Sequence, residues 1–197
     1  MRVFLDMADG GPFTIQMTTL LTDEQLMTQV ARADSAAFRQ LAGRHLTRAY
    51  AIAFRLLHSR EDAEEVAQEA ISKVWQKAAA FDPARSAFGT WFYRIVTNAA
   101  LDRLRRRKTP AENLDDHAEA LRDTAPTGED LRIKADETRR IRQAMSALPA
   151  TQQMALTLVY YEEFSQAEAA RIMNITTSAL EALLFRGKKG LKQRLTP

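Results

Sequence analysis

The residues with the clearest chemistry form a helix-turn-helix pattern near the C-terminal end, from Ser165 to Leu191. The second predicted helix ends in a cluster of lysine and arginine side chains, which can contact phosphates. Its early side chains can meet base edges in a major groove, where each base pair presents a distinct set of donors and acceptors. The candidate residues for this contact with duplex DNA are Thr177, Ser178, Glu181, Phe185, Arg186, Lys188 and Lys189.

Local signals predict where the two helices of this pattern begin. Ser165 with Glu168 forms a predicted capping box, and Asn174 stands where a tight turn requires a left-handed residue. Ser178 with Glu181 predicts a second capping box. Glu181 keeps two open interpretations, because it can close this cap or accept a hydrogen bond from a cytosine amino group. An ordinary helical hairpin remains the alternative for the whole segment.

A second group combines aromatic and cationic side chains around Trp91. On a helical projection Trp91 lies at the margin of an apolar stripe beside Arg94, Asn98 and Arg105, while Tyr93 points well away from that stripe. Exposed rings beside cations suit unpaired bases, since stacking contributes roughly 1–3 kcal/mol per base. These residues predict a contact with single-stranded DNA, although core packing is an equally open interpretation for Trp91.

The elements that must position these residues are helical, because every apolar pattern repeats at three- and four-residue steps. Capping residues predict helices from Thr22 to about Ala31 and from Asp34 to Leu57, and Ser59 starts a third. The apolar face of the third helix is predicted to contain Ala63, Val66, Ala67, Ala70, Ile71, Val74 and Trp75. Its opposite face is acidic. The fourth helix has Phe88 and Phe92 on its core stripe and ends in a basic cluster.

Breaks in these patterns divide the chain into two predicted domains. Asp82-Pro83 predicts a loop to about Ala87 inside the first domain, residues 22–108. Residues 109–128 form a predicted acidic linker, and residues 129–197 form the second domain. Residues 1–21 are predicted to be a disordered extension, with Met17 as an alternative start. We therefore expect an all-α protein of two small helical domains joined by a flexible linker, which at roughly 60–70 Å when extended would not force them to touch.

Composition excludes several classes of function. The sequence has no cysteine, which rules out disulfides and thiolate zinc sites and suits a reducing cytoplasm. His45, His58 and His117 lack metal-ligand spacing, so we expect no metal or cofactor. The sequence contains no phosphate-binding glycine loop, no nucleophile paired with a base and no apolar run that could span a membrane, so we expect neither an enzyme nor membrane insertion. The net charge is +3 with a pI of about 9.3, and basic clusters at 103–108 and 186–194 suggest two contacts with a polyanion.

Over residues 22–195 these features resemble the extracytoplasmic-function sigma factors of bacterial RNA polymerase. The most specific segments are residues 62–69 (DAEEVAQE), the run from Gly89 to Asn98, and the helix-turn-helix. The resemblance implies that Asp62, Glu65, Gln68 and Glu69 bind core RNA polymerase. It implies that the loop with Phe81, Asp82 and Arg85 captures an extruded base of the −10 promoter element. It also implies that Trp91 helps to separate the strands while Arg94, Asn98 and Arg105 hold the backbone.

The resemblance further implies that the second domain reads the −35 element as duplex and that an anti-sigma factor controls the protein. Two departures leave the −35 sequence open. Many relatives have a basic residue at the position of Glu181 or Leu183, and Gly187 and Gly190 weaken a helix by up to about 1 kcal/mol each. The competing hypotheses are a free-standing helix-turn-helix regulator and a helical adaptor that binds only proteins.

Overall fold

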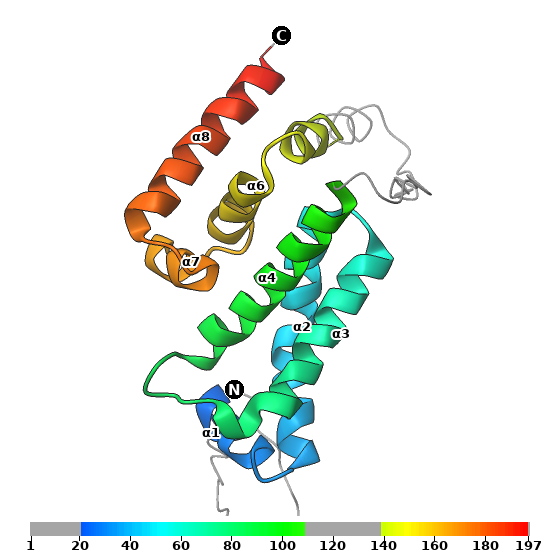
Figure 1. Cartoon of the computed structure of the whole chain (residues 1–197), viewed down its shortest axis with the longest axis vertical. Coiled ribbons are helices and arrows are strands. Elements are labelled where there is room, and N and C mark those ends of the chain that lie inside the picture. The colour runs from blue at the N-terminus through cyan, green and yellow to red at the C-terminus, as the bar shows by residue number, and fades with distance from the viewer. Residues whose placement is uncertain (1–20, 109–138, 197) are drawn as a thin grey trace, which may run out of the picture.

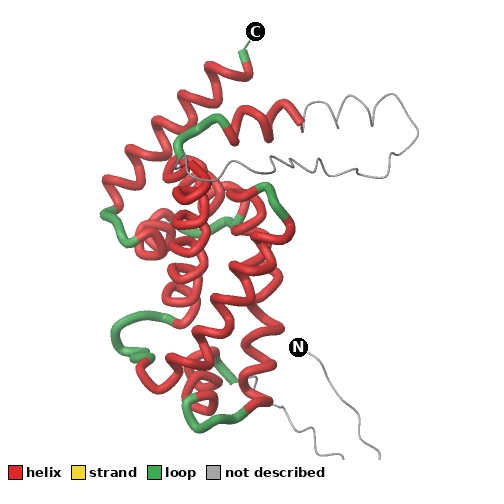
Figure 2. The backbone as a smooth tube through the Cα atoms, turned by 45° about the vertical axis from the view of Figure 1, so that its right-hand side comes forward, coloured by secondary structure: helices red, strands yellow, loops and turns green. Residues whose placement is uncertain are grey.

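The computed structural model describes residues 21–108 and 139–196. Residues 1–20 of the predicted N-terminal extension, the predicted acidic linker and residues 129–138 lie outside the described residues. The first range contains α1 (Asp23–Val30), α2 (Ser35–Leu57), α3 (Arg60–Lys77), the short 3₁₀ turn η1 (Ala78–Ala80) and α4 (Phe88–Lys108). The second contains helical residues 139–146, α6 (Ala150–Leu156), the π-helical turn η2 (Thr157–Tyr161), α7 (Gln166–Met173) and α8 (Thr177–Leu195). Each regular element in these two ranges is a helix, which confirms the predicted all-α class (Figure 2).

The helix starts of the first domain follow from local capping. Thr22 closes the predicted capping box with Gln25. The Asp34 carboxylate accepts hydrogen bonds from the backbone of Ala36 and Ala37 at 2.7 and 3.1 Å. A left-handed His58, with φ of 53°, ends α2, and the Ser59 hydroxyl caps α3. Such caps satisfy backbone donors that a helix leaves free, so these boundaries depend on a few neighbouring residues.

The core of the first domain is built from the apolar faces of α1 to α4. The rings of Phe88 and Phe92 stack with centroids 5.6 Å apart and are fully buried with Leu41 and Ile52. Burying side chains of this size contributes roughly 1.5–3 kcal/mol each. The prediction that Trp75 lies in this core was wrong. Trp75 is 42% exposed and its ring makes a T-shaped contact with the Phe38 ring, with centroids 5.3 Å apart, because it lies at the rim of α3 and not on its buried face.

The helix-turn-helix of the second domain has the predicted turn but a different second cap. Ser165 and Glu168 form the capping box of α7, and Asn174 is left-handed with φ of 55°. Helix α8 begins two residues earlier than predicted, because the Thr176 hydroxyl accepts from the backbone nitrogen of Ala179 at 3.2 Å. The predicted Ser178–Glu181 capping box was therefore wrong. Thr176 and Ser178 can both cap a helix, and in the structure Thr176 does so.

Gly187 and Gly190 let α8 approach the elements beneath it. A Cβ atom on Gly187 would lie 2.9 Å from Leu156 Cδ1, and one on Gly190 would lie 2.7 Å from Leu148 Cδ2. Both leucines are buried, so neither can easily move away. The two glycines lower the helix propensity of α8, but they permit a close approach to the leucines beneath it that any larger residue would obstruct.

The two domains lie against each other in the structure. Helix α7 lies beside α4, with the 139–146 helix and α6 further along it (Figure 1). Buried apolar residues from both domains belong to one continuous cluster. Side chains of α2 and α4 meet the segment between η2 and α7, where Arg48 of α2 binds Glu162.

Candidate nucleic-acid interface and polymerase-docking face

Helix α8 presents one side to solvent and anchors the other. Leu180 and Leu184 are buried against the rest of the second domain, and they fix the rotation of the helix. The residues predicted to contact duplex DNA are all exposed on α8: Thr177, Ser178, Glu181, Phe185, Arg186, Lys188 and Lys189. Phe185 is 70% exposed, which is unusual for a large apolar side chain. The face therefore offers hydroxyl, carboxylate, ring and cationic groups together.

The structure adds one residue to this face that sequence reasoning missed. The Lys188 ammonium lies over the Tyr160 ring, 4.7 Å from its centroid, and the tyrosine is 49% exposed. Tyr160 belongs to the π-helical turn η2, so its position beside α8 depends on tertiary packing. The contact orients the Lys188 side chain on the surface.

The loop before α4 places an aromatic pair beside a polar turn. The Phe81 ring lies 5.4 Å from the ring of Trp91, and both side chains are half-buried. The Asp82 carboxylate accepts from the backbone nitrogen of Ala84 at 2.9 Å and stabilises the turn. Asp82 and Arg85 are exposed. Trp91 is therefore compatible with both core packing and contact with DNA, because one part of the ring packs on Phe81 and Phe88 while another part reaches solvent.

The predicted backbone contacts lie further along α4. Asn98 and Arg105 are exposed, and Arg94 is half-buried. Arg105 Nη1 lies 3.2 Å from a carboxylate oxygen of Asp102, one turn away. The structure brings these three residues onto the helix that also holds Trp91.

Tyr93 is buried, although the sequence predicts that it points away from the apolar stripe of α4. It is 3% exposed, so the prediction that it points to solvent was wrong. Its hydroxyl lies 2.9 Å from His45 Nδ1, and its ring lies 5.3 Å from the ring of Phe164 in the second domain. Burial raises the pKa of the Tyr93 hydroxyl to about 12. Periodicity within α4 could not reveal this burial, because a partner far along the chain covers the tyrosine.

The acidic face of α3 is exposed but partly neutralised. Of the residues predicted to bind polymerase, Glu65, Gln68 and Glu69 are exposed and Asp62 is half-buried. Arg103 of α4 pairs with the carboxylates of Asp62 and Glu65. Lys73 lies 2.5 Å from Glu69, and its hydrogen bond lowers the pKa of that carboxyl group.

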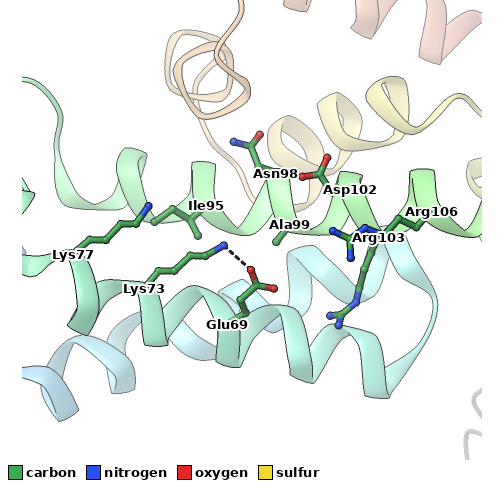
Figure 3. A pocket seen from close by; sticks show the side chains of 9 residues that line it. All are labelled: Glu69, Lys73, Lys77, Ile95, Asn98, Ala99, Asp102, Arg103 and Arg106. Atoms are coloured by element: carbon green, nitrogen blue, oxygen red, sulfur yellow. Dashed lines mark hydrogen bonds and ion pairs between the residues drawn. The ribbon is translucent and has the colours of Figure 1, made fainter.

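A shallow groove separates this face from α4, and sequence reasoning missed it. Figure 3 shows the cations Lys73, Lys77 and Arg106 around it, with Asn98 and Asp102 on the α4 side. The spacing of Glu69, Lys73 and Lys77 by four residues was the available signal, because such residues share one side of a helix. No cluster of three or more side chains suited to a metal ion occurs in residues 21–108 and 139–196, and no helix there is long and apolar enough to cross a membrane.

Comparison with known proteins gives a consistent set of relatives. The family model for Sigma-70 region 2 matches residues 41–109, and the model for Sigma-70 region 4 matches residues 138–191. The RNA polymerase sigma-H factor of Pseudomonas aeruginosa is 32% identical over 193 residues, which cover 92% of this chain and 97% of the relative. The ECF RNA polymerase sigma factor SigW of Bacillus subtilis is 28% identical over 176 residues, covering 85% and 93% of the two chains.

Solved structures share the fold at lower sequence identity. CnrH, solved in complex with the cytosolic domain of CnrY, is 23% identical with a TM-score of 0.65, and the match covers 88% of this chain and 96% of that one. The sigma factor RpoE of Bartonella quintana, solved with the anti-sigma factor NepR, is 22% identical with a TM-score of 0.58, covering 80% and 96%.

Proposed function

Because this chain belongs to the extracytoplasmic-function sigma factors of RNA polymerase, we propose that it directs core polymerase to promoters through three separate surfaces. These surfaces are the outer face of α3, the loop and first half of α4, and the exposed side of α8. The observation that carries the proposal is the exposed side of α8, which presents seven polar, cationic and aromatic candidates while Leu180 and Leu184 anchor the opposite side. Cationic and polar side chains gathered on one exposed helix suit the phosphates and base edges of duplex DNA.

Helix α8 would read the −35 element as duplex DNA. Thr177, Ser178, Glu181 and Phe185 would face base edges, and Phe185 suits the methyl group of a thymine. Since Thr176 caps the helix, the Glu181 carboxylate is left to accept from a cytosine amino group. Arg186, Lys188 and Lys189 would contact phosphates.

The loop before α4 and the exposed part of Trp91 would act on the −10 element. Phe81, Asp82 and Arg85 would surround an extruded base, and Trp91 would replace a stacking neighbour of the opened pair. Arg94, Asn98 and Arg105 would hold the separated strand. Tyr93 is left out of this base-stacking set, because His45 and Arg48 of α2, in the same domain, hold its hydroxyl and lie over its ring.

The outer face of α3 would bind core polymerase. Asp62, Glu65, Gln68 and Glu69 present carboxylates and an amide on one side of the helix, which suits a basic surface of the partner. Gln68 and Glu69 would be the centre of this contact, because Asp62 and Glu65 are held to Arg103 of α4, whereas the ion pair of Glu69 with Lys73 stays within α3.

We further propose that the protein is a cytoplasmic regulator without enzymatic activity or a cofactor, under the control of an anti-sigma factor. Two chains of the same fold support this last partner, since CnrH was solved with CnrY and RpoE with the anti-sigma factor NepR. A free-standing helix-turn-helix regulator is the weaker hypothesis, because it leaves the match to Sigma-70 region 2 without a role.

Transcription in vitro tests the proposed function directly. The purified chain is added to core polymerase that lacks any other specificity subunit, on a pooled genomic template, and the transcript starts are sequenced. We expect starts that share an upstream sequence and depend on the chain. Starts that are the same with and without the chain would refute the proposal.

A further inference from the structure

A buried carboxylate holds the two domains together. The Glu162 side chain, which lies between η2 and α7, is 8% exposed. Two arginines of α2 in the other domain bind it. Arg48 Nε lies 3.1 Å from Glu162 Oε2, and the Arg55 guanidinium pairs with Oε1. Arg48 also donates to the backbone carbonyl of Glu162. A carboxylate at such an interface is stable only while its partners stay in place, because a buried charge without a partner is costly.

An aromatic contact lies beside the charged one. The Arg48 guanidinium lies 3.9 Å from the centroid of the Phe164 ring, whose edge meets Tyr93. Tyr93 is held in turn by His45, whose Nε2 lies 2.7 Å from a carboxylate oxygen of Asp23. The contact therefore connects α1, α2 and α4 to a single segment of the second domain, residues 162–164.

The backbone of that segment is shaped for the contact. The turn η2 is π-helical, and the Glu162 nitrogen donates to the Thr157 carbonyl at 3.0 Å. Glu163 has a left-handed conformation with φ of 56°, which is uncommon for a residue other than glycine. Short π-helical turns and residues in such conformations occur often at functional positions. Here the two features together point Glu162 and Phe164 at the first domain while Glu163 stays exposed.

We propose that Glu162 and Phe164 form a latch that holds the free chain closed. The expectation that this latch opens on a promoter rests on the proposed function. The −10 and −35 elements are about 25 base pairs apart, or roughly 85 Å along a duplex. Helix α8 is only about 28 Å long and follows α7, which packs on α4 (Figure 1). The closed chain cannot span both elements, so the interface around Glu162 must separate.

Energy transfer between two dyes tests the latch. The chain has no cysteine, so Glu61→Cys near the start of α3 and Thr151→Cys near the start of α6 give one label in each domain at exposed positions, where the two domains lie side by side (Figure 1). We expect one high-transfer population for the free chain. Glu162→Gln removes the charge that both arginines bind and should lower the ratio of closed to open molecules by about tenfold. Glu163→Gln makes the same change one residue away, at an exposed side chain, and should leave the transfer unchanged.

Different results would overturn the latch, its opening on the promoter and the proposed function. Equal transfer in the two glutamine variants, or a broad low-transfer population in the chain with both glutamates, would overturn the latch. Far-UV circular dichroism of each variant checks that the helices remain folded. Adding core polymerase and promoter DNA should shift the labelled chain to low transfer, and a promoter complex that keeps high transfer would overturn the opening step. A chain that fails to bind polymerase at all would refute the proposed function, while the free-chain measurement would still decide the latch.

Discussion

At the scale of single residues, Thr176 before α8 and Glu181 on α8 have different proposed roles, one in folding and the other in DNA recognition. Thr176 caps the helix through the Ala179 nitrogen, and Glu181 stands exposed one turn later. A capping hydroxyl contributes roughly 0.5–2 kcal/mol to stability, whereas a carboxylate that meets a base edge discriminates between bases by roughly 1–3 kcal/mol. Substitution of Thr176 should therefore change the stability of the protein, and substitution of Glu181 should change its base preference.

We predict that Glu181→Gln changes which base is preferred in the −35 element without destabilising the protein. The neutral amide both donates and accepts, so the preference for a cytosine amino group should weaken or be lost. Transcription from a library of randomised −35 sequences measures this change. Thr176→Ala is the matched control, and it should lower the free energy of unfolding while the base preference stays the same. A shift in preference with Thr176→Ala, or none with Glu181→Gln, would contradict the assignment.

At the scale of elements, glycines on two helices predict opposite effects of the same substitution. Gly43 of α2 has no atom within 4 Å of an added Cβ, while Gly187 of α8 has Leu156 Cδ1 at 2.9 Å. Gly43→Ala should stabilise the protein by roughly 0.5–1 kcal/mol, because alanine restricts the unfolded chain and favours the helix. Gly187→Ala gains the same propensity but overpacks the contact with α6, at a cost of roughly 1–3 kcal/mol, so it should be neutral or destabilising. Urea unfolding of both variants measures the difference, and equal stabilisation would mean that α8 does not depend on close packing.

Helix boundaries could be predicted from the sequence because their causes are local. The caps at Thr22, Asp34, Ser59 and Ser165 and the left-handed Asn174 involve only residues a few positions apart. The start of α8 was missed because Thr176 and Ser178 can both cap a helix, and sequence alone does not rank them.

The environment of a side chain could not be predicted where a distant element decides it. Tyr93 was expected in solvent because it leaves the apolar stripe of α4, yet Phe164 of the other domain covers it. Trp75 matches an apolar pattern, yet within residues 21–108 and 139–196 it remains 42% exposed. The partners of Glu162, more than a hundred positions earlier in the chain, leave no periodic signal.

At the scale of the whole molecule, the acidic face of α3 and the cationic side of α8 belong to different domains and have different proposed partners. A change on one should leave the specificity of the other intact. Glu69 is the best position for this test because it is exposed and its ion pair with Lys73 stays within α3. Glu163 is an exposed carboxylate in the second domain, where no polymerase contact is proposed.

We predict that Glu69→Lys weakens binding to core polymerase about tenfold, or roughly 1.4 kcal/mol, because it reverses a charge at the centre of the proposed contact and places two lysines together. Glu163→Lys changes the net charge equally and should alter this affinity less than twofold. Fluorescence titration of labelled chain with core polymerase measures both. Transcription with Glu69→Lys should give fewer transcripts from unchanged start sites, because α8 and the loop before α4 still select the promoter. Altered start sites would show that α3 takes part in reading DNA, and equal loss of affinity in both variants would show that overall charge, not this face, attracts the polymerase.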